Sequence, residues 1–239
     1  MINKSDAIIS REALNNFKED SMNEMKTAKT FGITSSILSL TATVLISIDF
    51  YVFHNNILIL ILSYSIFIAN LIFLMLSIRP LSKIYQNNAI FLYYIVSFFI
   101  IIIDEYHALM GKIITYFNFI YVDINNFNAQ QKEIFIIYIA TALLIPVIGA
   151  YFFAKSFKLI GNSAGIKFFK ISGSLYFYQT VLALLSLNVL NYFILYLHVN
   201  KNSANVNIFN SVFLIIITVL SAISSLSALT GFLKLPSKE

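Results

Sequence analysis

Residues 57–78 read ILILILSYSIFIANLIFLMLSI, an uncharged run of 22 residues whose polar side chains are a few serines, Tyr64 and Asn70. A helix rises 1.5 Å per residue, so this run covers roughly 33 Å as a helix, enough to cross a hydrocarbon core of about 30 Å. The run therefore predicts a transmembrane helix, and it decides the class of fold.

Five further apolar runs exceed or approach the length of about 20 residues that spans a membrane as a helix. The composition agrees with them, because 59% of the residues are hydrophobic and only 11% are charged, whereas soluble domains carry about 25% charged residues. We expect an all-α integral membrane bundle of about six transmembrane helices, forming one domain over residues 31–235. The predicted spans lie near residues 31–53, 57–78, 87–110, 134–154, 172–198 and 206–235.

Residues 1–30 are charged and predict an amphipathic segment at the cytoplasmic surface, made of one or two short helices. Ser21 and Glu24 have the spacing of a capping box, which predicts a helix that starts there and runs into the first span. Before it, Ile9, Ala13 and Phe17 recur every four residues, as on a helix lying at a membrane surface. The alternative is a solvated and frayed segment.

The distribution of Lys and Arg predicts the orientation in the membrane. When the spans are threaded with the N-terminus inside, 13 basic residues fall on the inner side and 3 on the outer side. Cytoplasmic loops carry the excess of basic residues, so we expect a plasma-membrane protein with both termini in the cytoplasm. The net charge of +5 then reflects topology, and no nucleic acid partner is expected.

The third span is unusually short, because Ala89–Ile103 offers only fifteen uncharged residues before Asp104 and Glu105. We expect a long outer loop over residues 104–133. Within it, residues 113–122 are apolar but too short to span, so they could be interfacial, re-entrant or a continuation of the third helix.

Small and hydroxyl-bearing residues recur every four positions in the first and sixth spans. This spacing lets helix backbones approach closely, so it predicts that the two spans pack tightly against each other. The alternative is a solute pathway lined by hydroxyls. The predicted packing residues are Ser35, Ser39, Thr43, Ser47, Ser221, Ser225 and Ala228.

The other polar features of the spans favour packing over coupled transport. Pro146 lies in the fourth span and predicts a kink, because proline removes a helical hydrogen bond. The amides at membrane depth are expected to bond across the bundle; they are Asn70, Gln179, Asn188 and Asn191. No charged residue lies near the centre of a span, although a proton or ion relay usually needs one.

Histidines and carboxylates gather at the predicted outer ends of the spans. Imidazole and carboxylate together suit a transition metal such as zinc, copper or iron, and Asp104 and His107 share a helical face. The alternative is that these side chains simply suit the membrane interface. The metal candidates are His54, Asp104, Glu105, His107 and His198.

Nothing else in the sequence points to catalysis or to a cofactor. The chain has no cysteine, which excludes disulfides and thiolate chemistry, and it has none of the common nucleotide-binding or hydrolase motifs. The predicted inner loop over residues 155–170 carries four lysines; it serves either as a topological anchor or as a site for anionic lipid or phosphate.

Residues 152–185 read FFAKSFKLIGNSAGIKFFKISGSLYFYQTVLALL. An aromatic helix end leads into a short Lys/Gly/Ser loop, and a Phe-Phe-x-x-x-Gly motif opens the next span. This stretch, with the charged segment before the first span, resembles a family of uncharacterised multi-pass membrane proteins of archaea. The resemblance implies an archaeal plasma membrane and a helical bundle, and it supplies no catalytic residues.

Three functions remain open at this level. The first is a non-enzymatic accessory or structural subunit, in contact with membrane lipid, that packs against other membrane-protein subunits. The second is a transporter or channel for a small solute. The third is an outer-facing protein that binds a transition metal.

Overall fold

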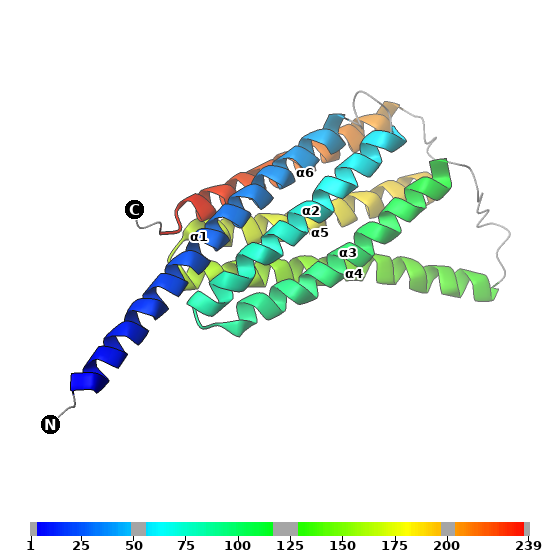
Figure 1. Ribbon diagram of the computed structural model, residues 1–239. Coiled ribbons are helices and arrows are strands. Elements are labelled where there is room, and N and C mark those ends of the chain that lie inside the picture. The colour runs from blue at the N-terminus through cyan, green and yellow to red at the C-terminus, as the bar shows by residue number, and fades with distance from the viewer. Residues whose placement is uncertain (1–3, 49–55, 117–128, 197–203, 237–239) are drawn as a thin grey trace.

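The chain folds into long helices (Figure 1). The computed structural model describes the backbone of residues 4–48, 56–116, 129–196 and 204–236. Side chains are described for residues 19–48, 56–59, 61–104, 144–186 and 211–236. Within these ranges there are six helices: α1 Lys4–Ile48, α2 Ile57–Ile84, α3 Asn88–Tyr116, α4 Ala129–Ser163, α5 Lys167–Tyr196 and α6 Ala204–Leu233. The predicted all-α class is confirmed.

Several of these helices are long and apolar enough to cross a membrane. Among the described residues four segments qualify by length and composition, namely Glu19–Ile48 in α1, Ile57–Ile84 (α2), Leu144–Ser163 in α4 and Ser211–Leu233 in α6. The apolar part of α3, Asn88–Asp104, is shorter. A membrane protein of helical type is therefore supported, and the count of six crossings stays a prediction.

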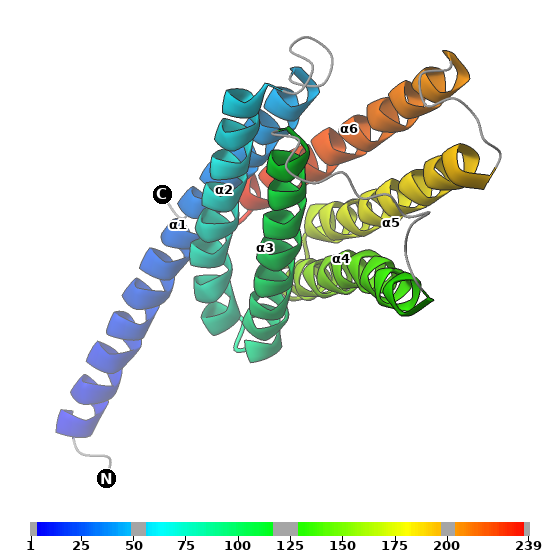
Figure 2. The same cartoon turned by 90° about the vertical axis from the view of Figure 1, so that its right-hand side faces the viewer.

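The helices form a closed ring in sequence order. Each helix packs against the next one along the chain, and α6 returns to pack against α1. Figures 1 and 2 show that the ends of the chain and the α2–α3 and α4–α5 connections lie at the same end of the molecule. This end, which carries most of the described lysines, is called the basic end below.

Two three-residue turns close the hairpins at the basic end. Between α2 and α3, Gln86 has a positive φ of 49°, and the Asn87 side chain accepts a hydrogen bond from the Ala89 N–H at 3.2 Å. Between α4 and α5, Gly165 has a φ of +67°, a conformation that glycine adopts without strain. Such short turns fix each helix antiparallel to its neighbour.

The core lies near the basic end and is rich in aromatic rings. Phe153 of α4 packs on Phe157 and on Tyr176 of α5, with ring centroids 4.5 and 4.4 Å apart. Phe169 of α5 meets Phe232 of α6 edge-on at 4.9 Å. Buried Leu and Ile residues of α2 and α3 complete this core, so all the helices converge here.

The structure differs from the predicted boundaries at three places. The predicted helix start at Ser21 is wrong, because α1 is already helical from Lys4 and passes through Ser21 without a break. The expected loop 104–133 is shorter, since α3 continues to Tyr116 and α4 begins at Ala129. Polar residues beyond an apolar run can extend a helix outside the bilayer, so the run alone underestimates helix length.

Candidate functional site

Hydroxyl groups of α1 and α6 face each other along three successive turns. The Ser39 and Ser225 hydroxyl oxygens lie 2.8 Å apart, and those of Thr43 and Ser221 lie 3.0 Å apart. The next pair, Ser47 with Thr218, is at 3.4 Å. We call these six residues the hydroxyl seam. Thr218 was not among the predicted residues, although it lies three positions before Ser221 and so shares its helical face.

The hydroxyls of α1 also bond within their own helix. The Thr43 hydroxyl donates to the Ser39 carbonyl at 2.9 Å, and the Ser47 hydroxyl donates to the Thr43 carbonyl at 2.8 Å. A hydroxyl has one proton to donate, so with this bond made Ser221 donates to Thr43. The seam thus satisfies its polar groups within the protein.

Two of the predicted packing residues lie elsewhere. Ser35 turns toward α2, where its hydroxyl donates to the side-chain oxygen of Asn70 at 2.6 Å. Ala228 is buried in the core cluster. Nearer the basic end, the Phe232 side chain of α6 packs against the α1 backbone at Gly32, because a Cβ added at Gly32 would collide with the Phe232 ring.

Other buried side chains bond to backbone carbonyls of neighbouring helices. Ser77 of α2 donates to the Ala28 carbonyl of α1 at 2.7 Å, and Tyr94 of α3 donates to the Leu71 carbonyl of α2 at 2.7 Å. Ser156 of α4 donates to the Ile90 carbonyl of α3 at 2.8 Å. These partners could not be predicted from the sequence, because every residue has a backbone carbonyl.

The contacts of α5 with its two neighbours depend on small residues. Ser224 of α6 donates to the Ser172 carbonyl at 3.0 Å. On the other side, a Cβ added at Gly173 would lie 3.0 Å from the Ala154 Cα and carbonyl oxygen and 2.8 Å from the Phe157 Cβ. The α4 and α5 backbones are therefore in contact at Gly173.

Two buried polar atoms have no hydrogen-bond partner among the described atoms, the Ser97 hydroxyl and the Gln179 carbonyl oxygen. Each lies one helical turn beyond a tyrosine, Tyr94 on α3 and Tyr176 on α5. Both tyrosine rings pack against Phe153, at 6.3 and 4.4 Å. Since α3 and α5 both run away from the basic end, the two polar groups lie at a similar depth along the bundle, one turn beyond the aromatic core.

Pro146 lies inside α4, which continues as a helix through it. In Figures 1 and 2 the part of α4 that precedes it diverges from α3. One turn later, the Gly149 backbone approaches α3 so closely that an added Cβ would lie 2.8 Å from Ile100 Cγ2. The kink at Pro146 remains a prediction.

Most of the predicted metal ligands lie outside the described side chains. This applies to His54, Glu105, His107 and His198, and also to the amides Asn188 and Asn191. Asp104 is described, half-buried at the far end of the apolar part of α3. In the described part of the chain no three His, Cys, Asp or Glu residues gather as a metal site would require. The metal site therefore stays a prediction.

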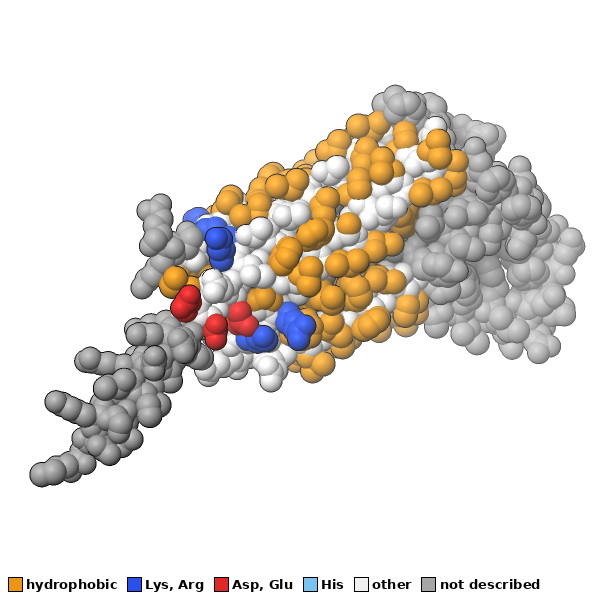
Figure 3. All heavy atoms as spheres, viewed as in Figure 1, with side chains coloured by type: hydrophobic (Ala, Val, Ile, Leu, Met, Phe, Trp, Pro, Cys, Tyr) orange, Lys and Arg blue, Asp and Glu red, His pale blue; other side chains and the backbone are white. Residues whose placement is uncertain are grey.

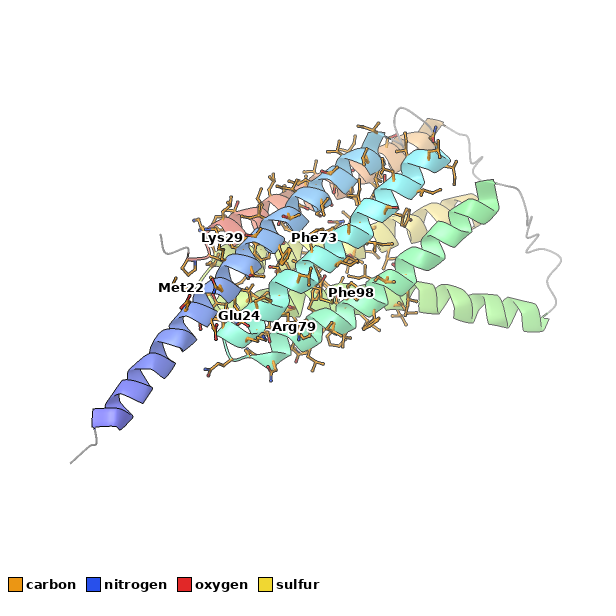
Figure 4. All side chains as sticks on the ribbon, viewed as in Figure 1. Met22, Glu24, Lys29, Phe73, Arg79 and Phe98 are labelled. Atoms are coloured by element: carbon orange, nitrogen blue, oxygen red, sulfur yellow. The ribbon has the colours of Figure 1, made fainter. Side chains whose placement is uncertain are left out.

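Charged side chains are concentrated at the basic end (Figure 3). Figure 4 places Glu24 and Lys29 on α1 and Arg79 on α2, with the uncharged surface of the bundle beyond them. Lys83 pairs with Glu24 at 2.8 Å, and the Lys29 ammonium donates to the Leu235 carbonyl just after α6 at 3.2 Å. Lys155 of α4 lies over the Tyr93 ring, 4.5 Å from its centroid.

The fold and these contacts define an all-α bundle with long apolar helices, bonded together by hydroxyl and amide groups. The chain belongs to the family described as protein of unknown function DUF996, which matches residues 66–197. It is also similar to the uncharacterized protein MJ1644 of Methanocaldococcus jannaschii, with 23% identity over 123 residues, covering 52% of this chain and 69% of that protein. The predicted resemblance to an uncharacterised archaeal family is thus confirmed. No solved structure matches the chain.

Proposed function

We propose that this protein crosses the plasma membrane six times and acts there as a non-catalytic accessory or structural subunit. The spans would be the four long apolar segments together with α3 and α5. These two helices have 29 and 30 residues, which corresponds to roughly 44 Å at the usual helical rise and exceeds a hydrocarbon core of about 30 Å. Their places in the closed ring, between spanning neighbours, support the same count.

The orientation that we propose in the membrane rests on the positive charge of the basic end. The α2–α3 and α4–α5 turns and the end of α6 lie together there, with the lysines of α2, α4 and α5 and with Lys234 just after α6. Positive charge is retained on the cytoplasmic side of a membrane. Both termini would therefore lie in the cytoplasm, and the far ends of the helices would face outward.

One observation carries the proposal of a subunit role. The N-terminal part of α1 projects beyond the basic end, and no other helix runs alongside it in either view (Figures 1 and 2). An isolated helix of this length is marginal in water, so a partner surface or the membrane surface would stabilise it. The four-residue spacing of Ile9, Ala13 and Phe17 gives this N-terminal part of α1, called the arm below, one apolar face for such a contact.

The bonding inside the bundle agrees with a structural role. Across five of the six neighbouring helix pairs, described side chains hydrogen-bond from one helix to the next. Groups that could line a solute path are in this way engaged in holding helices together. Interhelical bonds in membranes contribute about 0.6 to 2 kcal/mol each.

The test is purification of the full chain in a mild detergent, followed by native mass spectrometry. We expect a complex of defined stoichiometry with another membrane protein, and we expect Phe17→Asp to release that partner. Asn15→Asp is the matched control, because by helical spacing it introduces the same charge on the opposite face of the arm. A monomer from the unmodified chain, or equal effects of both variants, would count against the subunit role.

A second function, passage of a small polar solute, is favoured by the two unpartnered atoms of Ser97 and Gln179. A polar solute or water would satisfy them, since a buried polar group without a partner costs about 1–3 kcal/mol. Proteoliposomes exposed to glycerol and urea provide the test. Uptake that exceeds empty liposomes and falls in Ser97→Ala, but not in the exposed variant Ser174→Ala, would support transport. Transport would be opposed if the proteoliposomes take up neither solute and if Ser97→Ala is as stable as the unmodified chain or more stable.

A further inference from the structure

The basic end is divided into two parts of different charge. On the α1–α2 side, carboxylates accompany the cations, as in the pair between Lys83 and Glu24. On the α4–α6 side the described residues carry cations alone, because the sequence contains no Asp or Glu between residues 134 and 238. Its described cations are Lys155, Lys158, Lys167, Lys170 and Lys234.

Two of these lysines converge on one aromatic ring. Lys234, just after the end of α6, places its ammonium 4.6 Å from the centroid of Phe168. Lys167, at the start of α5, places its ammonium 5.9 Å from the same centroid. Both side chains are exposed. We call Lys167 and Lys234 the lysine pair.

The lysine pair has the electrostatics of an anion site. Cation–π attraction draws both ammonium groups to the Phe168 ring, and two like charges that share one ring repel each other. An anion between them would replace this repulsion with two attractions. The start of α5 adds to the positive field, because a helix carries partial positive charge at its N-terminus.

Exposed apolar side chains lie close to the lysine pair in the sequence of both helices. Ile171 lies one turn beyond Lys167 on α5 and is 40% exposed, and Leu233 adjoins Lys234 on α6 and is 53% exposed. Both lie on the side of the lysine pair that leads away from the basic end, along the length of the helices. Cations followed by exposed apolar side chains match a molecule with an anionic head and a hydrocarbon tail.

We propose that the lysine pair binds the phosphate headgroup of an anionic phospholipid, whose hydrocarbon chain lies along α5 and α6 against Ile171 and Leu233. The two ammonium groups donate charge-assisted hydrogen bonds to phosphate oxygens. This site rests on the membrane orientation proposed above. It does not depend on a partner protein, so its failure and that of the subunit role are separate results.

The experiment compares four forms of the full-length protein in a neutral detergent. Native mass spectrometry measures retention of phosphatidylglycerol, phosphatidylcholine and inorganic phosphate by the unmodified chain, by the double variant Lys167→Gln/Lys234→Gln and by Arg79→Gln/Lys83→Gln. The last variant removes two positive charges from the same end of the molecule and serves as the control. A fourth form, Lys167→Arg/Lys234→Arg, retains the charge and reports on folding.

We expect phosphatidylglycerol to bind the unmodified chain, the control and the arginine variant at least about tenfold more tightly than the double glutamine variant. We also expect a clear preference over phosphatidylcholine. If the double glutamine variant and the control lose affinity for phosphatidylglycerol equally, binding depends only on the overall positive charge of the basic end, and the proposed site is wrong. Binding of inorganic phosphate as tight as that of phosphatidylglycerol would overturn the assignment to a lipid.

Discussion

Gly173 shows how closely the α4 and α5 backbones approach, and it gives the first prediction. A methyl group there would meet the Ala154 backbone at 3.0 Å, and backbone atoms cannot move aside as a flexible side chain can. Gly173→Ala should therefore destabilise the bundle by about 1 to 3 kcal/mol, as overpacking does. Thermal melting in detergent measures this. The substitution of the neighbouring exposed residue, Ser174→Ala, is the control and should leave the melting temperature unchanged. If both variants have the same melting temperature, the α4 and α5 backbones do not approach as closely as described.

The Tyr94 hydroxyl gives a second prediction at the same scale. It is buried and donates to the Leu71 carbonyl at 2.7 Å, so Tyr94→Phe leaves that carbonyl without its side-chain donor. We expect a loss of about 0.6 to 2 kcal/mol in the free energy of unfolding. Tyr178→Phe removes the same hydroxyl from a side chain that is 62% exposed and should cost less. If both variants unfold alike, the interhelical bond does not stabilise the fold.

At the scale of the element, the sequence predicted positions better than partners. Periodic hydroxyls indicated the face of α1 that carries Ser39 and Thr43, and the structure brings that face against α6. Ser35 belongs to the same four-residue series but bonds to Asn70 of α2, because a helix enclosed by two neighbours divides its polar face between them. Bonds to backbone carbonyls, such as that of Ser77 with Ala28, could not be predicted, since acceptors of this kind are present at every residue. The ends of α3 and α4 differed because apolar length alone predicted them, and the start of α1 differed because Ser21 and Glu24 have the capping-box spacing inside a continuous helix.

The hydroxyl seam is tested by a matched pair of threonines on α1. The hydroxyls of Thr43 and Thr41 both donate to the carbonyl four residues earlier, at 2.9 and 3.0 Å, but only Thr43 faces α6, whereas Thr41 is exposed. Thr43→Leu should lower the melting temperature, by an amount equivalent to about 1 to 3 kcal/mol, because leucine overfills the contact with Ser221. Thr41→Leu should have little effect. Intact stability of Thr43→Leu together with lost solute uptake would instead favour a hydroxyl-lined pathway.

At the scale of the whole molecule, the ring and the basic end together predict which residues face the cytoplasm. Lys158 is exposed at the basic end, and Asp123 lies in the sequence between α3 and α4, within the predicted outer loop 104–133. Because the chain has no cysteine, a single one can be introduced at either position without background labelling. An impermeant maleimide applied to intact cells should modify Asp123→Cys and leave Lys158→Cys unmodified, whereas permeabilised cells should be labelled at both. The physical reason is that lysine-rich connections stay on the cytoplasmic side during insertion. Labelling of Lys158→Cys in intact cells would invert the orientation, and the lysine pair would then face the outer leaflet.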